Sequence, residues 1–163
     1  MEKIISKQYE IQSHIEKYSK QLAALLNAEP VKYSEWYTHK KSDLSKAAGI
    51  YHFFERDGDT ITSLYVGKAG FGSSSFGSSK WNLLKRLNQH FQVSQKNALL
   101  GKIAKATSKH PQRIKESLSK IDVFLQWLVL FEANSVNSEQ IESELIWSEC
   151  FCKSILMPKY TNA

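Results

Sequence analysis

The fold is decided by residues 49–68, which read GIYHFFERDGDTITSLYVGK. This stretch holds two runs of β-branched and aromatic residues, 49–56 and 60–68, and neither run shows the helical spacing of apolar side chains. Asp57-Gly58-Asp59 lies between the runs and favours a turn. The stretch therefore predicts a β-hairpin.

Two tyrosines stand at matching places in this hairpin. A three-residue turn centred on Gly58 sets Tyr51 opposite Tyr65, and residues that face each other across two strands share one face of the sheet. Lys68 has the opposite parity. We expect Gly67 to bend the end of the strand and to turn Lys68 toward the tyrosines.

A helix is predicted at residues 83–91, which read LLKRLNQHF. Asn82 can cap its first turn, because a side-chain oxygen at that position accepts a hydrogen bond from a free backbone N–H. Arg86 and His90 are four residues apart, so the helix places them on one face. The helix therefore offers a guanidinium and an imidazole side by side.

A strand and a further helix complete one compact domain, which we assign to residues 47–163. Residues 121–131, IDVFLQWLVLF, are apolar and β-prone and are the best candidate for a buried central strand. Residues 138–153 predict a helix that Ser138 opens as its N-cap. Its inward-facing side chains are expected to be Ile141, Leu145 and Ile146.

The segment before this domain, residues 1–46, predicts a helix over residues 1–28 and a connector with a helical turn. Pro30 ends the helix, because a residue that precedes proline is disfavoured in the α conformation. One apolar stripe runs along the helix and contains Ile4, Ile11, Ile15, Tyr18, Leu22 and Leu25. The stripe fits either the seam of a homodimer through residues 1–28 or a helix laid across its own domain. We favour the second, since about three heptads interrupted by a polar residue are marginal for a coiled coil.

The composition limits the class of protein. The chain has 163 residues, with 22 Lys plus Arg against 16 Asp plus Glu and a formal net charge of +6. This length suits one domain. The two cysteines, Cys150 and Cys152, cannot form a disulfide framework and favour a reducing, cytoplasmic setting. Since no apolar run approaches the roughly 18 residues of a membrane span, we expect no membrane partner.

Positive charge concentrates in residues 93–120, which hold 7 basic side chains and 1 acidic one. A localised basic segment suits a polyanion, because each neutralised phosphate releases counterions. The nucleic-acid contacts are expected from Lys102, Lys105, Lys109, Arg113, Lys115 and Lys120. The alternative is a solvated helix face, which charge alone does not exclude.

Six sequence elements, in their order along the chain, resemble the GIY-YIG nuclease family. GIY at 49–51 and YVG at 65–67 match the two tripeptides of its signature, and Lys68 follows directly. The other elements are R-x-x-x-H at Arg86 and His90, E-x-x-L-I at residues 142–146, and a closing P…N at Pro158 and Asn162. The resemblance covers roughly residues 47–163, although Asn162 falls one residue later than in the commonest spacing.

The resemblance implies an α+β fold in which helices flank a small, mainly antiparallel three-stranded sheet. It also implies an endonuclease that hydrolyses phosphodiester bonds with Mg²⁺ or Mn²⁺, held by Glu142. A single carboxylate suits Mg²⁺, which often takes waters and phosphate oxygens as its other ligands. The implied site holds Tyr51, Tyr65, Lys68, Arg86, His90, Glu142 and Asn162.

Within that implied site, Tyr51 orients or deprotonates the attacking water, while Arg86 and Lys68 stabilise the phosphate. An unperturbed phenol has a pKa of about 10, so the role of a base requires nearby positive charge. His90 either hydrogen-bonds within the site or shares the proton transfer.

The expected partner is nucleic acid, with DNA as the first choice, cut by a stand-alone domain similar in form to the small restriction endonucleases of the family. Each residue alone also has a structural explanation, since strand tyrosines usually pack, and Glu144 and Glu149 are equal candidates to Glu142. Two alternatives stay open. One is a nucleic-acid-binding or partner-recruiting module without cleavage, and the other is a nuclease directed to single strands or RNA.

Overall fold

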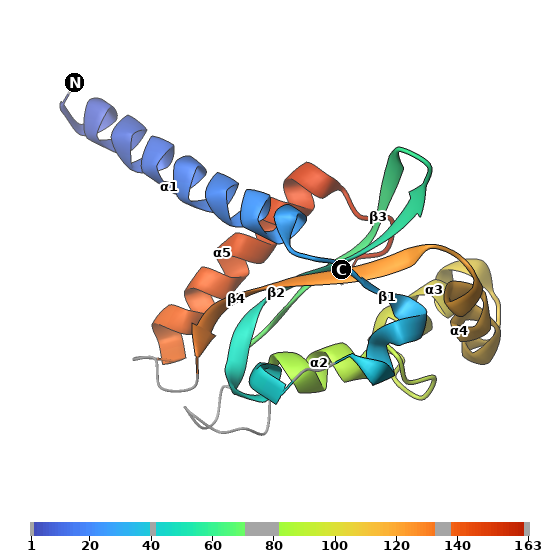
Figure 1. Ribbon diagram of the computed structural model, residues 1–163. Helices are drawn as coiled ribbons and strands as arrows, with labels where there is room; N and C mark the ends of the chain where they lie inside the picture. The colour runs from blue at the N-terminus through green and yellow to red at the C-terminus, as the bar shows by residue number, and fades with distance from the viewer. Residues whose placement is uncertain (1, 40–41, 71–81, 133–137, 162–163) are drawn as a thin grey trace.

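The computed structural model describes residues 2–39, 42–70, 82–132 and 138–161, which form helices on either side of one sheet (Figure 1). The elements before the hairpin are α1 (Glu2–Asn27), β1 (Val31–Lys32) and the 3-10 helices η1 (Tyr33–Thr38) and η2 (Ser42–Lys46). The hairpin is β2 (Ala47–Asp57) and β3 (Thr60–Ala69). The elements after it are α2 (Leu83–Gln89), α3 (Leu99–Thr107), α4 (Pro111–Lys120), β4 (Val123–Glu132) and α5 (Ser138–Leu156).

The described strands form one antiparallel sheet in the order β1-β4-β2-β3, so the fold is α+β. The prediction of a three-stranded sheet was wrong by one strand. Val31 and Lys32 of the predicted connector pair with Leu125 and Phe124 of β4. A two-residue strand shows no alternation of apolar and polar residues, so the sequence pattern cannot indicate it.

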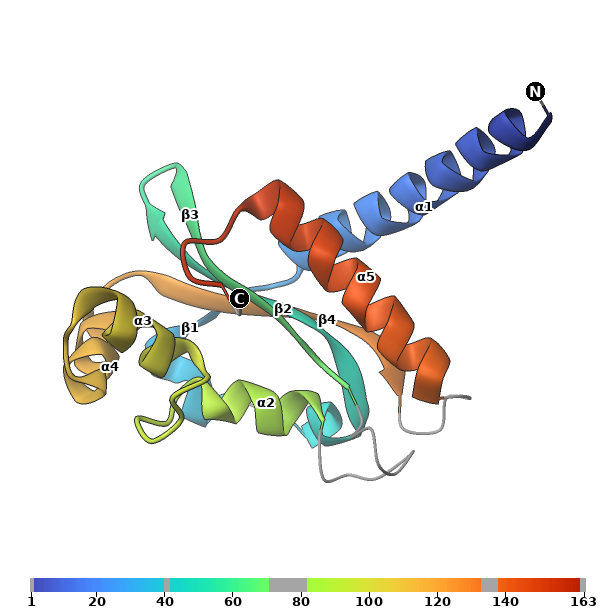
Figure 2. The same cartoon turned by 180° about the vertical axis from the view of Figure 1, so that it is seen from behind.

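Helices cover both faces of the sheet (Figures 1 and 2). Helices α1 and α5 lie on one face, where Leu22, Ile50 and Val66 belong to one buried cluster. Helices α2, α3 and α4 lie on the other face, where Trp36 and Phe53 belong to the largest cluster. Both faces of β2 are therefore buried, and its alternating side chains enter two different cores.

Helix α1 confirms the predicted N-terminal helix, and its two halves differ in environment. Tyr18, Leu22 and Leu25 of the apolar stripe are buried, as expected for a helix laid across its own domain. Ile11 and Ile15 of the same stripe are 53% and 44% exposed. Figure 1 shows this N-terminal half projecting away from the sheet. A dimer seam, if α1 forms one, is thus restricted to the half before Tyr18.

Helix α5 confirms the predicted C-terminal helix, with one error in its inward face. Ile141 and Leu145 are buried as expected, but Ile146 is 46% exposed. Successive helical residues point about 100° apart, so burial of Leu145 turns its neighbour toward solvent. Among the described residues, no helix is both long and apolar enough to cross a bilayer.

The hairpin has a different register from the predicted one. Asp57 pairs with Thr60, so the turn contains two residues, and Gly58 adopts the positive φ of 60° that such turns require. The ladder then shifts between Phe53 and Phe54, which is a β-bulge. Beyond the bulge, Tyr65 pairs with Phe53 rather than with Tyr51.

Candidate active site

The bulge in β3 decides which side chains can form a site. In the register that begins at the turn, Tyr65 would lie on the face opposite to Tyr51, because a shift of one residue exchanges the two faces. The bulge adds one residue and brings Tyr65 to the face of Tyr51, where the two rings stack with centroids 6.1 Å apart. The expectation of a shared face is confirmed, but by a bulge and not by direct pairing.

Gly67 makes room for the phenol of Tyr51. The two residues are partners across the β2–β3 ladder, and the ring of Tyr51 lies over the Gly67 backbone. A Cβ at position 67 would collide with the Tyr51 hydroxyl and with the ring carbon that bears it. The glycine of the YVG tripeptide therefore has a steric role, because the absence of a Cβ leaves the space over β3 that the phenol of Tyr51 occupies.

Helix α2 brings Arg86 and His90 to the two phenols. Asn82 caps the helix as predicted, with its side-chain oxygen accepting from the Lys85 N–H at 2.9 Å. The His90 Nε2 atom lies 2.6 Å from the Tyr51 hydroxyl oxygen. The guanidinium of Arg86 interacts with both Tyr51 and Tyr65. Four of the predicted site residues therefore meet, from β2, β3 and α2.

The environment of His90 fixes the proton of its ring. The backbone N–H of Leu99 donates to Nδ1 at 2.8 Å, so this nitrogen is an acceptor and the neutral ring carries its proton on Nε2. Nε2–H then donates to the hydroxyl oxygen of Tyr51. Burial, and next the charge of Arg86, hold the pKa of His90 well below its usual value of 6.5. At neutral pH His90 is thus a hydrogen-bond donor to the phenol and not a base toward it.

The phenol of Tyr51 is fully buried in this structure. Burial raises its pKa well above the usual value of 10, and the neighbouring Tyr65 and Glu149 raise it further. Arg86 lowers the pKa of Tyr51, but burial has the larger effect. The role of a base requires positive charge near this phenol. Among the described side chains, Arg86 is the group that lowers the pKa of Tyr51.

Lys68 and Glu142 form a separate pair on the other face of the sheet. Lys68 pairs with Ile50 across the ladder and keeps the parity of the α5 face, so the expectation that Gly67 would turn it toward the tyrosines was wrong. Its ammonium lies 3.3 Å from a Glu142 carboxylate oxygen, and the Glu142 side chain is 43% exposed. The other carboxylate oxygen lies beside Gly70.

The two groups nevertheless flank one edge strand. The phenol of Tyr51 lies over Gly67, while the carboxylate of Glu142 lies beside Lys68 and Gly70. Strand β3 is at the edge of the sheet. Helix α2 lies on one face of the sheet and α5 lies on the other (Figure 2).

Glu149 is the carboxylate that sequence reasoning could not single out. It lies on α5, is 8% exposed and pairs with Lys153 at 3.3 Å. Its charge also acts on Tyr51. Glu144, the third candidate, pairs instead with Lys17 of α1. Of these three carboxylates, Glu142 alone begins the E-x-x-L-I spacing, and the packing of α5 gives each a different partner.

Gln89 and Tyr33 are further groups that the sequence did not indicate. Gln89 accepts a hydrogen bond from Arg86 Nη1 at 2.6 Å, and the Tyr33 hydroxyl donates to the His90 carbonyl at 3.2 Å.

Asn162 lies outside the described residues. Nearby, the N–H groups of Lys159 and Tyr160 donate to the carbonyls of Ser63 and Leu64, so the chain lies along β3 just before Asn162.

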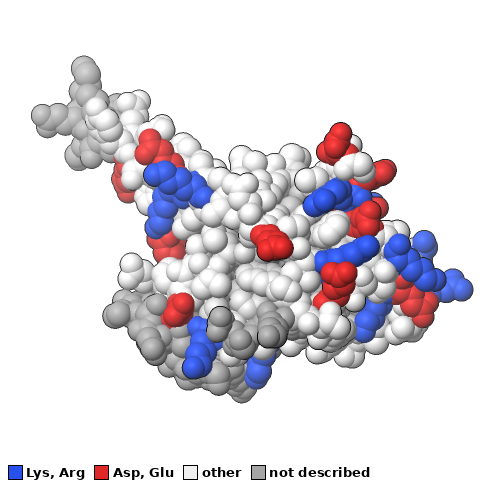
Figure 3. Space-filling model, in the orientation of Figure 1, with Lys and Arg blue, Asp and Glu red and all other residues white. Residues whose placement is uncertain are grey.

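The predicted basic segment forms helices α3 and α4, which break before Pro111 as expected. None of its six candidate contact residues forms an ion pair with a carboxylate that the structure describes. The ammonium of Lys115 lies 5.7 Å from the centre of the exposed Tyr37 ring. Figure 3 shows Lys and Arg gathered at this end of the molecule, with acidic side chains among them.

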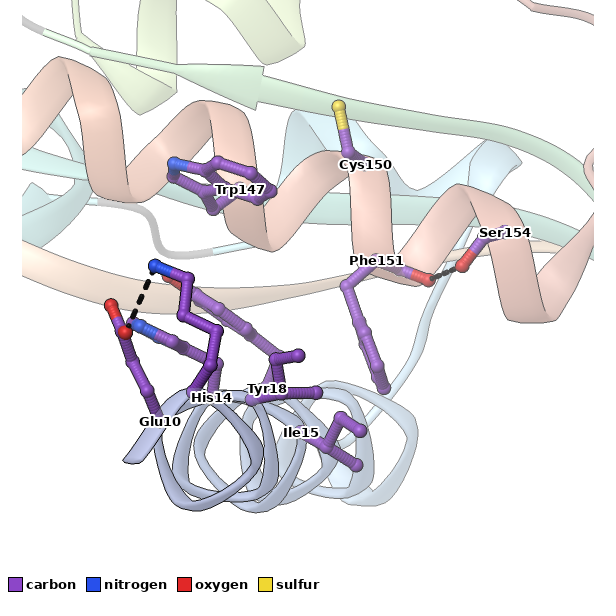
Figure 4. Close-up of a pocket in the computed structure, with 10 residues that line it drawn as sticks. Glu10, His14, Ile15, Tyr18, Trp147, Cys150, Phe151 and Ser154 are labelled. Carbon is purple, nitrogen blue, oxygen red and sulfur yellow. Dashed lines mark hydrogen bonds and ion pairs between the residues drawn. The ribbon is translucent and has the colours of Figure 1, made fainter. Parts of the chain in front are cut away.

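A groove of about 600 Å³ lies between the projecting half of α1 and the outer side of α5. Ile11 and Ile15 line it from α1, and Trp147 and Phe151 line it from α5. Figure 4 shows Phe151 projecting from α5 toward α1. This groove is on the sheet face opposite to Tyr51 and His90, so it is no part of the candidate active site.

Of the predicted site residues, the structure brings Tyr51, Tyr65, Arg86 and His90 into contact with one another. Lys68 and Glu142 pair with each other on the opposite face of the sheet. Comparison with known protein families, with curated proteins and with solved structures gave no match for this chain.

Proposed function

We propose that this chain is a divalent-metal-dependent endonuclease of the GIY-YIG type and fold that hydrolyses phosphodiester bonds in DNA. One observation carries the proposal: Tyr51 of β2 meets Arg86 and His90, which belong to a distant helical segment, around one hydroxyl oxygen. Packing alone does not require a guanidinium beside two buried phenols. Phosphodiester hydrolysis does use such a set, because it needs an activated water and cationic donors for the phosphoryl oxygens.

The roles follow from the chemistry of each group. The oxygen of Tyr51 accepts from His90 and faces Arg86, and both favour the phenolate that would take a proton from water. Arg86 donates to Gln89 and to the Asn97 carbonyl and hydrogen-bonds both phenols, and it would exchange one of these contacts for a non-bridging phosphate oxygen. Lys68 would contact the phosphate from the other side of the β3 edge.

Glu142 fits the requirements of a Mg²⁺ or Mn²⁺ ligand. It supplies a partly exposed carboxylate whose partner, Lys68, can be replaced by a cation. Among the described residues no three His, Cys, Asp or Glu side chains are clustered for a metal, so waters and phosphate oxygens would complete the ligands. Such an ion stabilises the charge that develops on the phosphoryl group.

The proposal is tested by incubating the protein with supercoiled plasmid and Mg²⁺ or Mn²⁺. We expect conversion to nicked or linear DNA, and complete loss of this conversion in excess EDTA, because the metal is required for charge neutralisation. Cutting that persists in EDTA would reject the role of the metal. Single-stranded DNA and RNA of the same sequence show which nucleic acid is preferred. Binding without cutting of any substrate would support the non-cleaving module instead.

The basic surface of α3 and α4 is the proposed DNA contact. Replacing Lys102, Lys105 and Lys109 with alanine should weaken binding and flatten the dependence of log K on log salt by about one unit per lost phosphate contact. Fluorescence anisotropy with a labelled duplex at several salt concentrations measures this slope. Alanines at Lys7, Lys17 and Lys20 of α1 make the same change of charge on the other sheet face and are the control. Equal slopes for both triple variants would show that α3 does not contact the phosphates.

A further inference from the structure

We propose that the backbone N–H of Leu99, at the first turn of α3, is a positioning group for Tyr51. It holds His90 in the tautomer whose proton is on Nε2, and His90 then aligns the phenol by donating to its oxygen. The effect on cutting rests on the proposed function. The tautomer itself does not, and it is measurable without substrate.

The hydrogen bonds form a chain from helix α3 to the phenol. Leu99 N–H donates to Nδ1 at 2.8 Å, and Nε2 lies 2.6 Å from the Tyr51 oxygen. A neutral imidazole has one donor and one acceptor nitrogen, so the first contact determines the second. If the proton moved to Nδ1, it would face the Leu99 N–H, and two donors would oppose each other.

The surroundings leave the ring of His90 no other arrangement. His90 is fully buried and packs against the rings of Tyr51, Phe53 and Tyr65, with centroids about 5 Å away. A rotated ring would place carbon atoms against the Leu99 N–H and leave a buried donor without a partner, which is costly.

The same hydrogen bond ties the candidate DNA surface to the candidate site. Leu99 is the first residue of α3, and the basic residues Lys102 and Lys105 lie on that helix. Helix α3 packs with Leu99, Leu100 and Ile103 in the main core, next to the residues of α2. A shift of α3 against α2 would therefore lengthen the Leu99–His90 contact, together with the contact of Arg86 with the Asn97 carbonyl just before α3.

The test exchanges Leu99 for proline or valine, two residues of similar volume. Leu99→Pro removes the N–H, whereas Leu99→Val keeps it. Proline is tolerated here, because position 99 is the first helical residue and Ala98 has the extended backbone (φ −104°, ψ −178°) that a following proline favours. Both variants shorten the same buried side chain, so a difference between them reports the N–H.

The readout is the ¹⁵N shift of both His90 nitrogens at neutral pH, assigned with a His90→Asn variant. Wild type and Leu99→Val should carry the proton on Nε2, and Leu99→Pro should show a mixture of tautomers. The kcat of Leu99→Pro for plasmid cutting should be about 10- to 100-fold lower than that of Leu99→Val, and the two KM values should be similar. A wild-type proton on Nδ1, or an unchanged tautomer in Leu99→Pro, would overturn the proposal.

A second variant tests what determines the tautomer of His90 even if Leu99→Pro does not fold. Tyr51→Phe removes the acceptor of Nε2–H and leaves the Leu99 contact intact. The Nε2–H tautomer should persist in Tyr51→Phe, because Leu99 and not Tyr51 determines it. Loss of that tautomer would show that the phenol orders the ring and would reverse the proposed direction of positioning.

Discussion

Replacement of Glu142 by glutamine is expected to lower the rate of plasmid cutting by about a thousandfold or more while DNA binding is retained. The amide keeps the size of the side chain and removes the charge that would hold the metal. A bound metal ion contributes several kcal/mol to stabilisation of the transition state, and each 1.4 kcal/mol is about tenfold in rate. Cleavage under single-turnover conditions and binding by anisotropy separate the two effects.

Glu144→Gln is the matched control for this variant. Glu144 lies two residues away on α5 and pairs with Lys17 of α1, so the same change there should leave cutting near the wild-type rate. Stability should change little in Glu142→Gln, because a partly exposed ion pair such as Lys68–Glu142 contributes about 1 kcal/mol or less. Equal cutting by both variants would remove Glu142 from the site.

The hairpin shows how far sequence patterns reach. The runs of β-branched and aromatic residues in 49–68 correctly predicted two strands with a turn at Gly58, because the preferences of strand and turn residues act locally. The register depends on a bulge near Phe53 and Phe54, and no local residue preference indicates it. The predicted shared face of Tyr51 and Tyr65 was right, although it depends on the bulge. Lys68 keeps the opposite parity that the pattern gave it, and only the expected bend at Gly67 was wrong.

The candidate site likewise contains contacts that the sequence predicts and contacts that it does not. Arg86 and His90 were predicted on one helix face, because a spacing of four residues fixes this without tertiary information. The contacts of Leu99 with His90 and of Gln89 with Arg86 involve a backbone N–H and a common polar side chain, which carry no motif. The E-x-x-L-I spacing pointed to Glu142, whereas the partners of Glu142, Glu144 and Glu149 depend on the packing of α5 against β3 and α1.

Tyr51→Phe is expected to slow cutting by about 10²- to 10⁴-fold, the range of a lost general acid–base group. The variant removes one oxygen and keeps the ring that stacks on Tyr65, so DNA binding should be unchanged. Single-turnover cleavage at saturating protein measures the chemical step directly. A rate near that of the wild type would eliminate the phenol as the base.

The control and the pH dependence make this test specific to the phenol of Tyr51. Tyr33→Phe also removes one buried hydroxyl next to His90, but that hydroxyl donates to a carbonyl, so cutting should stay within a few-fold of wild type.

Because burial raises the pKa of Tyr51 well above 10, its phenolate fraction grows about tenfold per pH unit across the neutral range. The wild-type rate should therefore rise with pH from 7 to 9, with no inflection near 6.5, since burial lowers the pKa of His90 below that range. A rate that levels off near pH 6.5 would assign the proton transfer to an imidazole instead of the phenol.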